Sequence, residues 1–121
     1  MRWLRPTVVE AREGNLVFMY EVRKEWLNPV GSLHGGVTAA IIDDVIGATM
    51  FSYNEDNFYT TINNVIDYFS SVGEGEKIVA ETRIVKKGKQ FVNAQCDVWN
   101  SNKTKLIAKG SSNLFKVEGK K

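Results

Sequence analysis

A single long segment without proline, His34 to about Tyr53, carries the only strong helical pattern in the sequence. Its apolar residues recur at intervals of three and four, in a first row of Val37, Ile41, Val45 and Ala48 and a second row of Ile42, Ile46 and Met50. Because the two rows make the helix apolar over most of its circumference, we expect it to be buried. About 18 helical residues extend roughly 27 Å, so the covering structure must be of similar length.

The rest of the sequence has the alternating pattern of β-strands. A hairpin is predicted from Thr7–Arg12 and Leu16–Val22, and a polar loop, Lys24–Gly31, leads from it to the helix. Four more strands are predicted after the helix, at Phe58–Phe69, Lys77–Lys86, Gln90–Trp99 and Lys105–Val117. A mostly apolar helix among six strands can be covered only by an antiparallel sheet that curls around it. The pattern therefore predicts an α+β hotdog fold, in which a curved antiparallel sheet of about six strands wraps one long central helix.

The outer face of such a sheet would still carry apolar residues, namely Val79, Val85, Phe91 and Trp99. Exposed apolar surface of this kind indicates a partner subunit.

The bulk properties are those of one ordinary folded domain, predicted to span residues 1–121. Hydrophobic residues make up 43% and charged residues 25%, as in ordinary globular proteins. The net charge of +2 is spread along the chain and does not indicate a nucleic-acid-binding surface. Cys96 is the only cysteine, so no intrachain disulfide can form, and Met1–Glu10 lacks the apolar core of a secretory signal. No stretch approaches the roughly 18 apolar residues that span a bilayer. We therefore expect a cytoplasmic protein without a membrane span.

Two glycines, Gly35 and Gly36, stand where the loop enters the predicted helix. A ligand can approach the backbone closely there because no side chain is in the way. The first N–H groups of a helix lack intrahelical partners and its dipole favours negative charge, so this point suits a developing oxyanion. Alternatively, the pair only shapes the loop or packs against a strand, and the glycines alone leave both interpretations open.

Two adjacent carboxylates, Asp43 and Asp44, lie about two turns further along the helix. A carboxylate in an apolar helix is costly unless it is hydrogen-bonded or reaches water. Asp44 continues the row of Val37 and Ile41, whereas Asp43 continues a row of small residues, namely Gly36, Ala40 and Gly47. Small neighbours leave space for a substrate or another subunit. The periodicity therefore favours Asp43 as the functional carboxylate and predicts a structural hydrogen bond or ion pair for Asp44.

The segment Asn28-Pro-x-Gly31-x-x-His34-Gly35-Gly36, followed eight residues after Gly35 by Asp43, is a specific pattern. It resembles that of hotdog acyl-CoA thioesterases of the phenylacetyl-CoA thioesterase type. Less specific pieces extend the resemblance over nearly the whole chain, at Asp67–Ser70, Gly75-Glu76, Val85–Lys89 and Leu106–Gly110.

The resemblance implies hydrolysis of an acyl-CoA thioester to the free acid and CoA, in a site shared by two subunits of a homodimer. Relatives often pair such dimers into tetramers. One subunit would supply Asn28 and the Gly35 N–H, which polarises the thioester carbonyl, and the other Asp43 and Ser70. Asp43 would activate water or attack directly, while Asn28 and Ser70 would position the water or the carbonyl. Such hydrolysis needs a base or nucleophile opposite oxyanion donors. No cofactor is implied, because CoA is part of the substrate.

Other candidate residues surround this site. His34 and Gly36 are expected to lie at the substrate, and His34 would shape the loop there. Because His34 is the only histidine, a catalytic role is the alternative interpretation. In the family, basic residues near Lys86, Lys87 and Lys89 hold the phosphates of CoA, and a merely solvated hairpin is the equal alternative.

One histidine and one cysteine cannot make a zinc site, so no metal is expected. Cys96 falls among the alternating apolar residues of its strand and is expected to pack as a small hydrophobe.

Two other functions are compatible with a hotdog domain. A non-catalytic module could bind acyl-CoA without turnover, but it would need no carboxylate at the thioester. A hydratase would need an Asp/His pair with another spacing. The combination of Asn28, Gly35 and Asp43 favours the thioesterase, with the binding module as the alternative.

Overall fold

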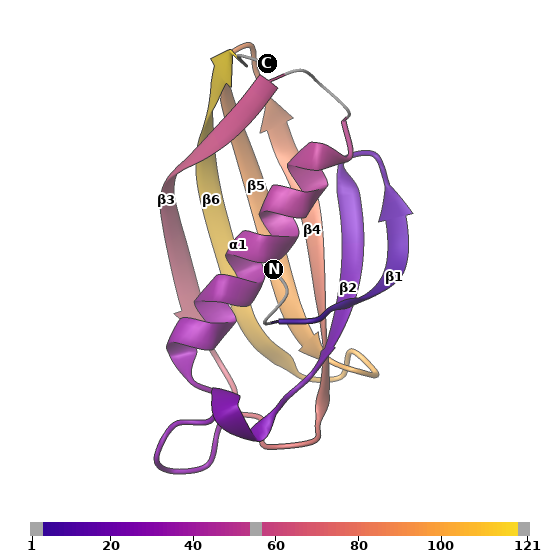
Figure 1. Cartoon of the computed structure of the whole chain (residues 1–121), viewed down its shortest axis with the longest axis vertical. Coiled ribbons are helices and arrows are strands. Elements are labelled where there is room, and N and C mark those ends of the chain that lie inside the picture. The colour runs from indigo at the N-terminus through magenta and orange to yellow at the C-terminus, as the bar shows by residue number, and fades with distance from the viewer. Residues whose placement is uncertain (1–3, 54–56, 119–121) are drawn as a thin grey trace.

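The computed structural model describes residues 4–53 and 57–118, which form one helix lying against one curved sheet (Figure 1). The helix, α1, spans Gly35–Phe51, and a short 3-10 helix, η1, spans Lys24–Trp26 in the predicted loop. The six strands are β1 (Thr7–Arg12), β2 (Asn15–Glu21), β3 (Asn57–Tyr68), β4 (Lys77–Lys87), β5 (Phe91–Asn100) and β6 (Leu106–Glu118). Their order in the sheet is β1-β2-β4-β5-β6-β3, and all neighbours are antiparallel. The predicted hotdog arrangement is confirmed.

The predicted helix is slightly too long at both ends. α1 begins at Gly35 because His34 is its N-cap, and it ends at Phe51, two residues before the predicted Tyr53. The Ser52 hydroxyl donates to the Thr49 carbonyl and accepts the N–H of Gly14 at 2.9 Å, which ties the β1–β2 turn to the end of the helix. Gly14 has a φ of +77°, and a Cβ there would overlap the Tyr53 hydroxyl, so this turn requires glycine.

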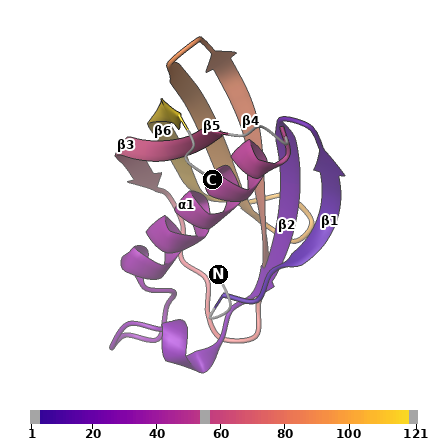
Figure 2. The same ribbon diagram turned by 45° about the horizontal axis from the view of Figure 1, so that its top comes forward.

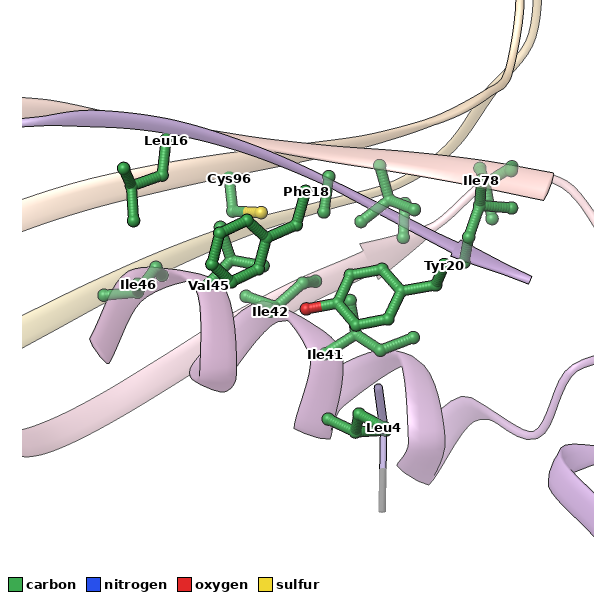
Figure 3. Packing of buried hydrophobic residues seen from close by; sticks show 14 of the residues in the cluster. Leu4, Leu16, Phe18, Tyr20, Ile41, Ile42, Val45, Ile46, Ile78 and Cys96 are labelled. Atoms are coloured by element: carbon green, nitrogen blue, oxygen red, sulfur yellow. The ribbon is translucent and has the colours of Figure 1, made fainter. Parts of the chain in front are cut away.

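The concave face of the sheet receives one side of α1, as Figure 2 shows from a tilted view. Ile41, Ile42, Val45 and Ile46 are at most 1% exposed and pack against the inward-facing residues of the strands (Figure 3). Burying each of these side chains fully contributes roughly 1.5–3 kcal/mol. The helix approaches β6 closely at Gly110, where a Cβ would lie 2.8 Å from Ile42 Cγ2. A side chain at Gly110 would therefore push helix and sheet apart.

Cys96 belongs to this core, as predicted. It alternates along β5 with Val92, Ala94 and Val98, all of them buried. Burial raises the pKa of the Cys96 thiol to about 12, so the thiol stays protonated and packs as a small apolar group.

The opposite side of α1 is not covered by the part of the chain that the structure describes. Gly36, Asp43 and Phe51 are exposed there, and Phe51 is 82% exposed. The prediction of a helix buried over most of its circumference is therefore wrong for this side of the single chain, because the sheet curves around only one side of α1.

The outer face of the sheet partly matches the sequence prediction. Val85 and Phe91 are 54% and 57% exposed, and Trp99 is half-buried. Val79 departs from the prediction because it is only 7% exposed, between its cross-strand neighbours Met19 and Trp99. Among the described residues, no helix combines the length and the apolar character needed to cross a membrane.

Candidate active site

The N-terminus of α1 is organised by His34. Its Nδ1 accepts the N–H of Gly36 at 2.8 Å, and its carbonyl accepts the N–H groups of Val37 and Thr38 at 3.0 and 3.1 Å. A Cβ at Gly36 would lie 3.1 Å from the His34 ring, which explains the glycine that follows the cap by two positions. His34 thus has a structural role as the N-cap, and the Gly36 N–H is hydrogen-bonded to its ring.

The Gly35 N–H has no hydrogen-bond acceptor in the part of the chain that the structure describes. Its carbonyl accepts the Tyr68 hydroxyl at 2.9 Å, and a Cβ on Gly35 would lie 3.4 Å from the Tyr68 ring. Tyr68 therefore holds the first residue of the helix against the end of β3. The Gly35 N–H lies at the positive end of the helix dipole.

Asp43 is exposed and lies at the polar end of a pocket between α1 and β3. The Thr61 hydroxyl donates to Asp43 Oδ1 at 3.3 Å. The pocket has a volume of about 220 Å³ and is lined by Asp43, Gly47, Met50, Phe51, Phe58, Tyr59, Thr61 and Leu114. A carboxylate held beside an open, partly apolar pocket can take a proton from water or attack a bound carbonyl.

Asp44 points to the other side of the helix, toward β2. Its Oδ2 accepts the hydroxyl of the buried Tyr20 at 3.1 Å, so the predicted structural hydrogen bond is confirmed. Burial, together with the charge and hydrogen bond of Asp44, raises the pKa of Tyr20 well above its usual range. Tyr20 therefore remains a neutral donor to Asp44.

The Asn28 side chain organises the loop before the helix. Its Oδ1 accepts the N–H groups of Val30 and Ser32, both at 3.1 Å, and its Nδ2 donates to the Ser32 hydroxyl at 3.0 Å. The loop is anchored beside the helix because the His34 N–H donates to the Trp26 carbonyl at 2.9 Å. Asn28 thus shapes the segment that leads to Gly35.

Ser70 is half-buried just after β3, where its N–H donates to the Ile107 carbonyl at 3.2 Å. Neither Ser70 nor Asn28 is hydrogen-bonded to Asp43 within the described residues. The single chain therefore does not bring all the predicted catalytic residues together.

The three predicted lysines are divided between the two faces of the sheet. A bulge between Ile84 and Lys86 shifts the register, so that Lys86 pairs with Asn93 and Lys87 with the buried Val92. The Lys87 ammonium lies 4.8 Å from the centroid of the Tyr53 ring. Lys86 and Lys89 instead line a groove of about 440 Å³ with Gly88, Gln90, Phe91, Val92, Asn93 and Asn113.

Asn113 and Asn93 lie in register with each other, and both are sequence neighbours of residues that face the helix. Because side chains alternate along a strand, these asparagines belong to the outer face of the sheet. The groove thus lies on the opposite face of the sheet from Asp43 of the same chain.

No group of three His, Cys, Asp or Glu side chains that could hold a metal ion occurs within residues 4–53 and 57–118.

Three residues near the predicted site were not singled out by the sequence. Tyr68 contacts Gly35, Thr61 contacts Asp43, and Gly47 lines the pocket. Thr61 alternates in β3 like many other residues. Tyr68 belongs to the Asp67–Ser70 piece of the resemblance, but nothing in the sequence links its side chain to Gly35. For Gly47 a signal was present, because it belongs to the row of small residues that also contains Asp43.

Comparison with known proteins identifies the family. The sequence profile of the thioesterase superfamily matches residues 30–107. Acyl-coenzyme A thioesterase 13 of Homo sapiens is 31% identical over 104 residues, which cover 86% of this chain and 74% of the human protein. With a match over more than half of its length, the chain belongs to the thioesterase superfamily, and we conclude that it is a thioesterase.

Solved structures agree on the fold. A Streptococcus mutans protein, solved bound to acetyl-CoA, superposes with a TM-score of 0.88 at 24% identity and covers 97% of this chain and 92% of that chain. A variant of the phenylacetic acid degradation protein PaaI from Thermus thermophilus superposes with a TM-score of 0.87 at 23% identity and covers 97% of both chains. These likenesses confirm the hotdog fold, and the matching family profile confirms the thioesterase family that the sequence resembles.

Proposed function

We propose that this thioesterase hydrolyses acyl-CoA, with Asp43 as base or nucleophile. The observation that carries the proposal is the exposed Asp43 carboxylate at the polar end of the pocket between α1 and β3. The acetyl-CoA bound to the Streptococcus mutans protein and the name of the human relative support CoA as the thiol part of the substrate.

The proposed reaction adds water across the thioester. With Asp43 as base, the carboxylate takes a proton from water while the water oxygen bonds to the carbonyl carbon. The Gly35 N–H stabilises the negative charge that develops on the carbonyl oxygen. The C–S bond then breaks, the electron pair leaves with sulfur, and the proton passes to the thiolate. The products are the free acid and CoA, and no cofactor takes part.

The other predicted site residues assist this step in the proposal. Asn28 and Ser70 position the water or the carbonyl, and His34 and Gly36 shape the backbone around Gly35. The role proposed for His34 is supported by its hydrogen bond to the Gly36 N–H, which holds the first turn of α1 in place.

Two chains are needed for such a site. Gly35 and Asp43 are eight residues apart on one helix, which corresponds to roughly 12 Å at 1.5 Å per residue. An oxyanion donor and a base acting on the same carbonyl must each come within hydrogen-bonding reach of the reacting atoms, about 3 Å. One chain cannot meet both requirements with this pair. We therefore propose a homodimer in which Asn28 and Gly35 of one subunit face Asp43 and Ser70 of the other.

The surface of β3 supports a second copy as the partner. β3 is the last strand of the sheet, so one of its edges has no neighbouring strand among the described residues. Four large apolar or aromatic side chains along β3, and Phe69 directly after it, are each more than half exposed; the four are Phe58, Ile62, Val65 and Tyr68. A long apolar edge strand is normally covered by another chain. The exposed Val85 and Phe91 on the outer face would serve a further pairing of dimers.

The groove around Lys86 and Lys89 is proposed to bind CoA phosphates. Because it lies across the sheet from Asp43 of its own chain, the CoA would belong to a site formed by neighbouring subunits. We narrow the proposal to these two lysines because the Lys87 ammonium already lies over the Tyr53 ring.

Replacing Lys86 and Lys89 by Ala is expected to raise KM for acyl-CoA, and the loss should shrink as salt rises. Exposed charge contacts are screened over roughly 8–10 Å at moderate ionic strength. Lys77→Ala, which removes the same charge at the other end of β4, is the control and should change little. A short thioester without the nucleotide should not respond to either change. Equal losses on both substrates would instead assign these lysines to the fold.

The proposed function is tested by incubating the protein with acetyl-, hexanoyl-, phenylacetyl- and palmitoyl-CoA and measuring thiol release. We expect release from at least one of them well above the rate without protein. Binding of these compounds without any release would identify a non-catalytic acyl-CoA-binding module and reject the proposal.

A further inference from the structure

The pocket beside Asp43 is polar at one end and mostly apolar along the rest of its wall. Asp43 and Thr61 form the polar end, and the other side chains of the wall are those of Met50, Phe51, Phe58, Tyr59 and Leu114. Among the described residues that line the pocket, Asp43 is the only charged one. A ligand there would therefore meet a carboxylate at its reacting end and apolar side chains beyond it.

Gly47 lies one helical turn after Asp43, on the wall of this pocket. Glycine inside a helix is unfavourable relative to alanine, so its presence calls for a reason. For Gly36 the reason is the His34 ring, which a Cβ would approach to 3.1 Å. A Cβ at Gly47, by contrast, would meet no atom within 4 Å beyond the backbone of the helix itself. Nothing among the described residues explains the missing side chain, and Gly47 lines the pocket.

We propose that this pocket receives an uncharged, apolar acyl group and that Gly47 determines how much room the acyl group has. The inference rests on the proposed function, because it places the thioester at Asp43. An acyl group that extends from the carbonyl would pass Gly47 first and then contact Met50, Phe51 and Phe58. Any side chain at position 47 would project into that path.

The volume and the charge of the pocket define the class of acyl group. An apolar cavity of about 150 Å³ holds a benzene molecule, so a pocket of about 220 Å³ accepts one aromatic ring or an aliphatic chain of similar bulk. An acyl group that ends in a carboxylate would find no cation among the described residues of the pocket wall and would be repelled by Asp43. Acyl groups from dicarboxylic acids are thus excluded from the preferred substrates.

The first test compares acetyl-, hexanoyl- and glutaryl-CoA with the wild-type protein. Hexanoyl and glutaryl groups are similar in length and differ in their terminal charge. We expect kcat/KM for hexanoyl-CoA to exceed that for glutaryl-CoA by about 10-fold or more, because the pocket leaves the second carboxylate without a counter-ion. An equal or higher value for glutaryl-CoA would overturn the inference.

The second test changes the pocket itself. Gly47→Leu should lower the ratio of kcat/KM for hexanoyl-CoA to that for acetyl-CoA by about 10-fold. One methylene more or less in an apolar pocket already changes kcat/KM by about this factor. Gly47→Ala should shift this ratio in the same direction by less. Ala40→Leu is the matched control, because Ala40 lies in the same row of small residues but outside the pocket lining. It should leave the ratio unchanged.

Thermal unfolding and size-exclusion chromatography accompany these assays. We expect the melting temperature of both Gly47 variants to equal or exceed that of the wild type, because glycine is the poorer helix former. If Gly47→Leu dissociates the oligomer and lowers activity on all substrates equally, the space above Gly47 belongs to a second copy and the inference is wrong. A wild-type protein that releases no thiol from any acyl-CoA would reject the proposed function itself.

Discussion

Asp43→Asn is expected to lower kcat by a factor of about 10² to 10⁴ while leaving the protein folded. The amide has nearly the same shape as the carboxylate and can still accept the Thr61 hydroxyl, which donates to Asp43 Oδ1 at 3.3 Å. It cannot take a proton from water, and it is a poor nucleophile. Thiol release under saturating acyl-CoA measures the loss, and circular dichroism with a thermal melt verifies the fold.

Asp44→Asn is the matched control, since it makes the same chemical change at the adjacent helical position. Asp44 accepts the hydroxyl of buried Tyr20 at 3.1 Å, so a neutral acceptor should cost about 1 kcal/mol of stability and change the rate little. An inactive Asp44→Asn protein beside an active Asp43→Asn protein would show that the two carboxylates have the opposite roles.

Mixing two inactive variants, Asp43→Asn and Asn28→Ala, is expected to restore activity. In a mixed dimer one site receives Asn28 from one subunit and Asp43 from the other, both unchanged, while the second site carries both substitutions. With free exchange at equal concentrations, half of the dimers are mixed and half of their sites are intact. The recovered activity should therefore approach about one quarter of the wild-type value for a twofold-symmetric dimer.

A second mixture distinguishes shared sites from a general effect of mixing. Asp43→Asn combined with Ser70→Ala should show no gain over the mean of the two parents, because both residues are proposed to come from the same subunit of each site. Exchange is verified by copurification of differently tagged chains. If exchange is demonstrated and Asn28→Ala also fails to rescue Asp43→Asn, each site is built within one chain.

The different environments of Asp43 and Asp44 were predictable from the sequence because they depend on the helical period alone. Adjacent residues are rotated by about 100° around a helix, so one of the two carboxylates had to face away from the other. Asp44 continues an apolar row, and Asp43 continues a row of small residues. Asp44 therefore meets Tyr20 of β2, and Asp43 lies exposed beside the pocket.

The positions of the three lysines were not predictable from the sequence. Lys86, Lys87 and Lys89 are neighbours in the sequence, and nothing in their order reveals that Lys87 turns toward Tyr53 while Lys86 and Lys89 line the outer groove. Lys86 and Lys87 lie on opposite faces because side chains alternate along a strand. A bulge between Ile84 and Lys86 adds one residue and thereby decides that Lys86, and not Lys87, is on the outer face. Whether a strand bulges depends on its pairing with the neighbouring strand.

The sequence by itself determined the helix, the strand pattern, the hotdog fold and the different surroundings of Asp43 and Asp44, because each depends on periodicity along a short segment. Only the tertiary structure decided that Tyr68 holds Gly35 and that Thr61 contacts Asp43, residues that are 33 and 18 positions apart in the chain. It also decided that the space above Gly47 is open. These contacts arise from the way β3 packs beside the helix, and a side chain's distant neighbours are set by that packing rather than by local spacing.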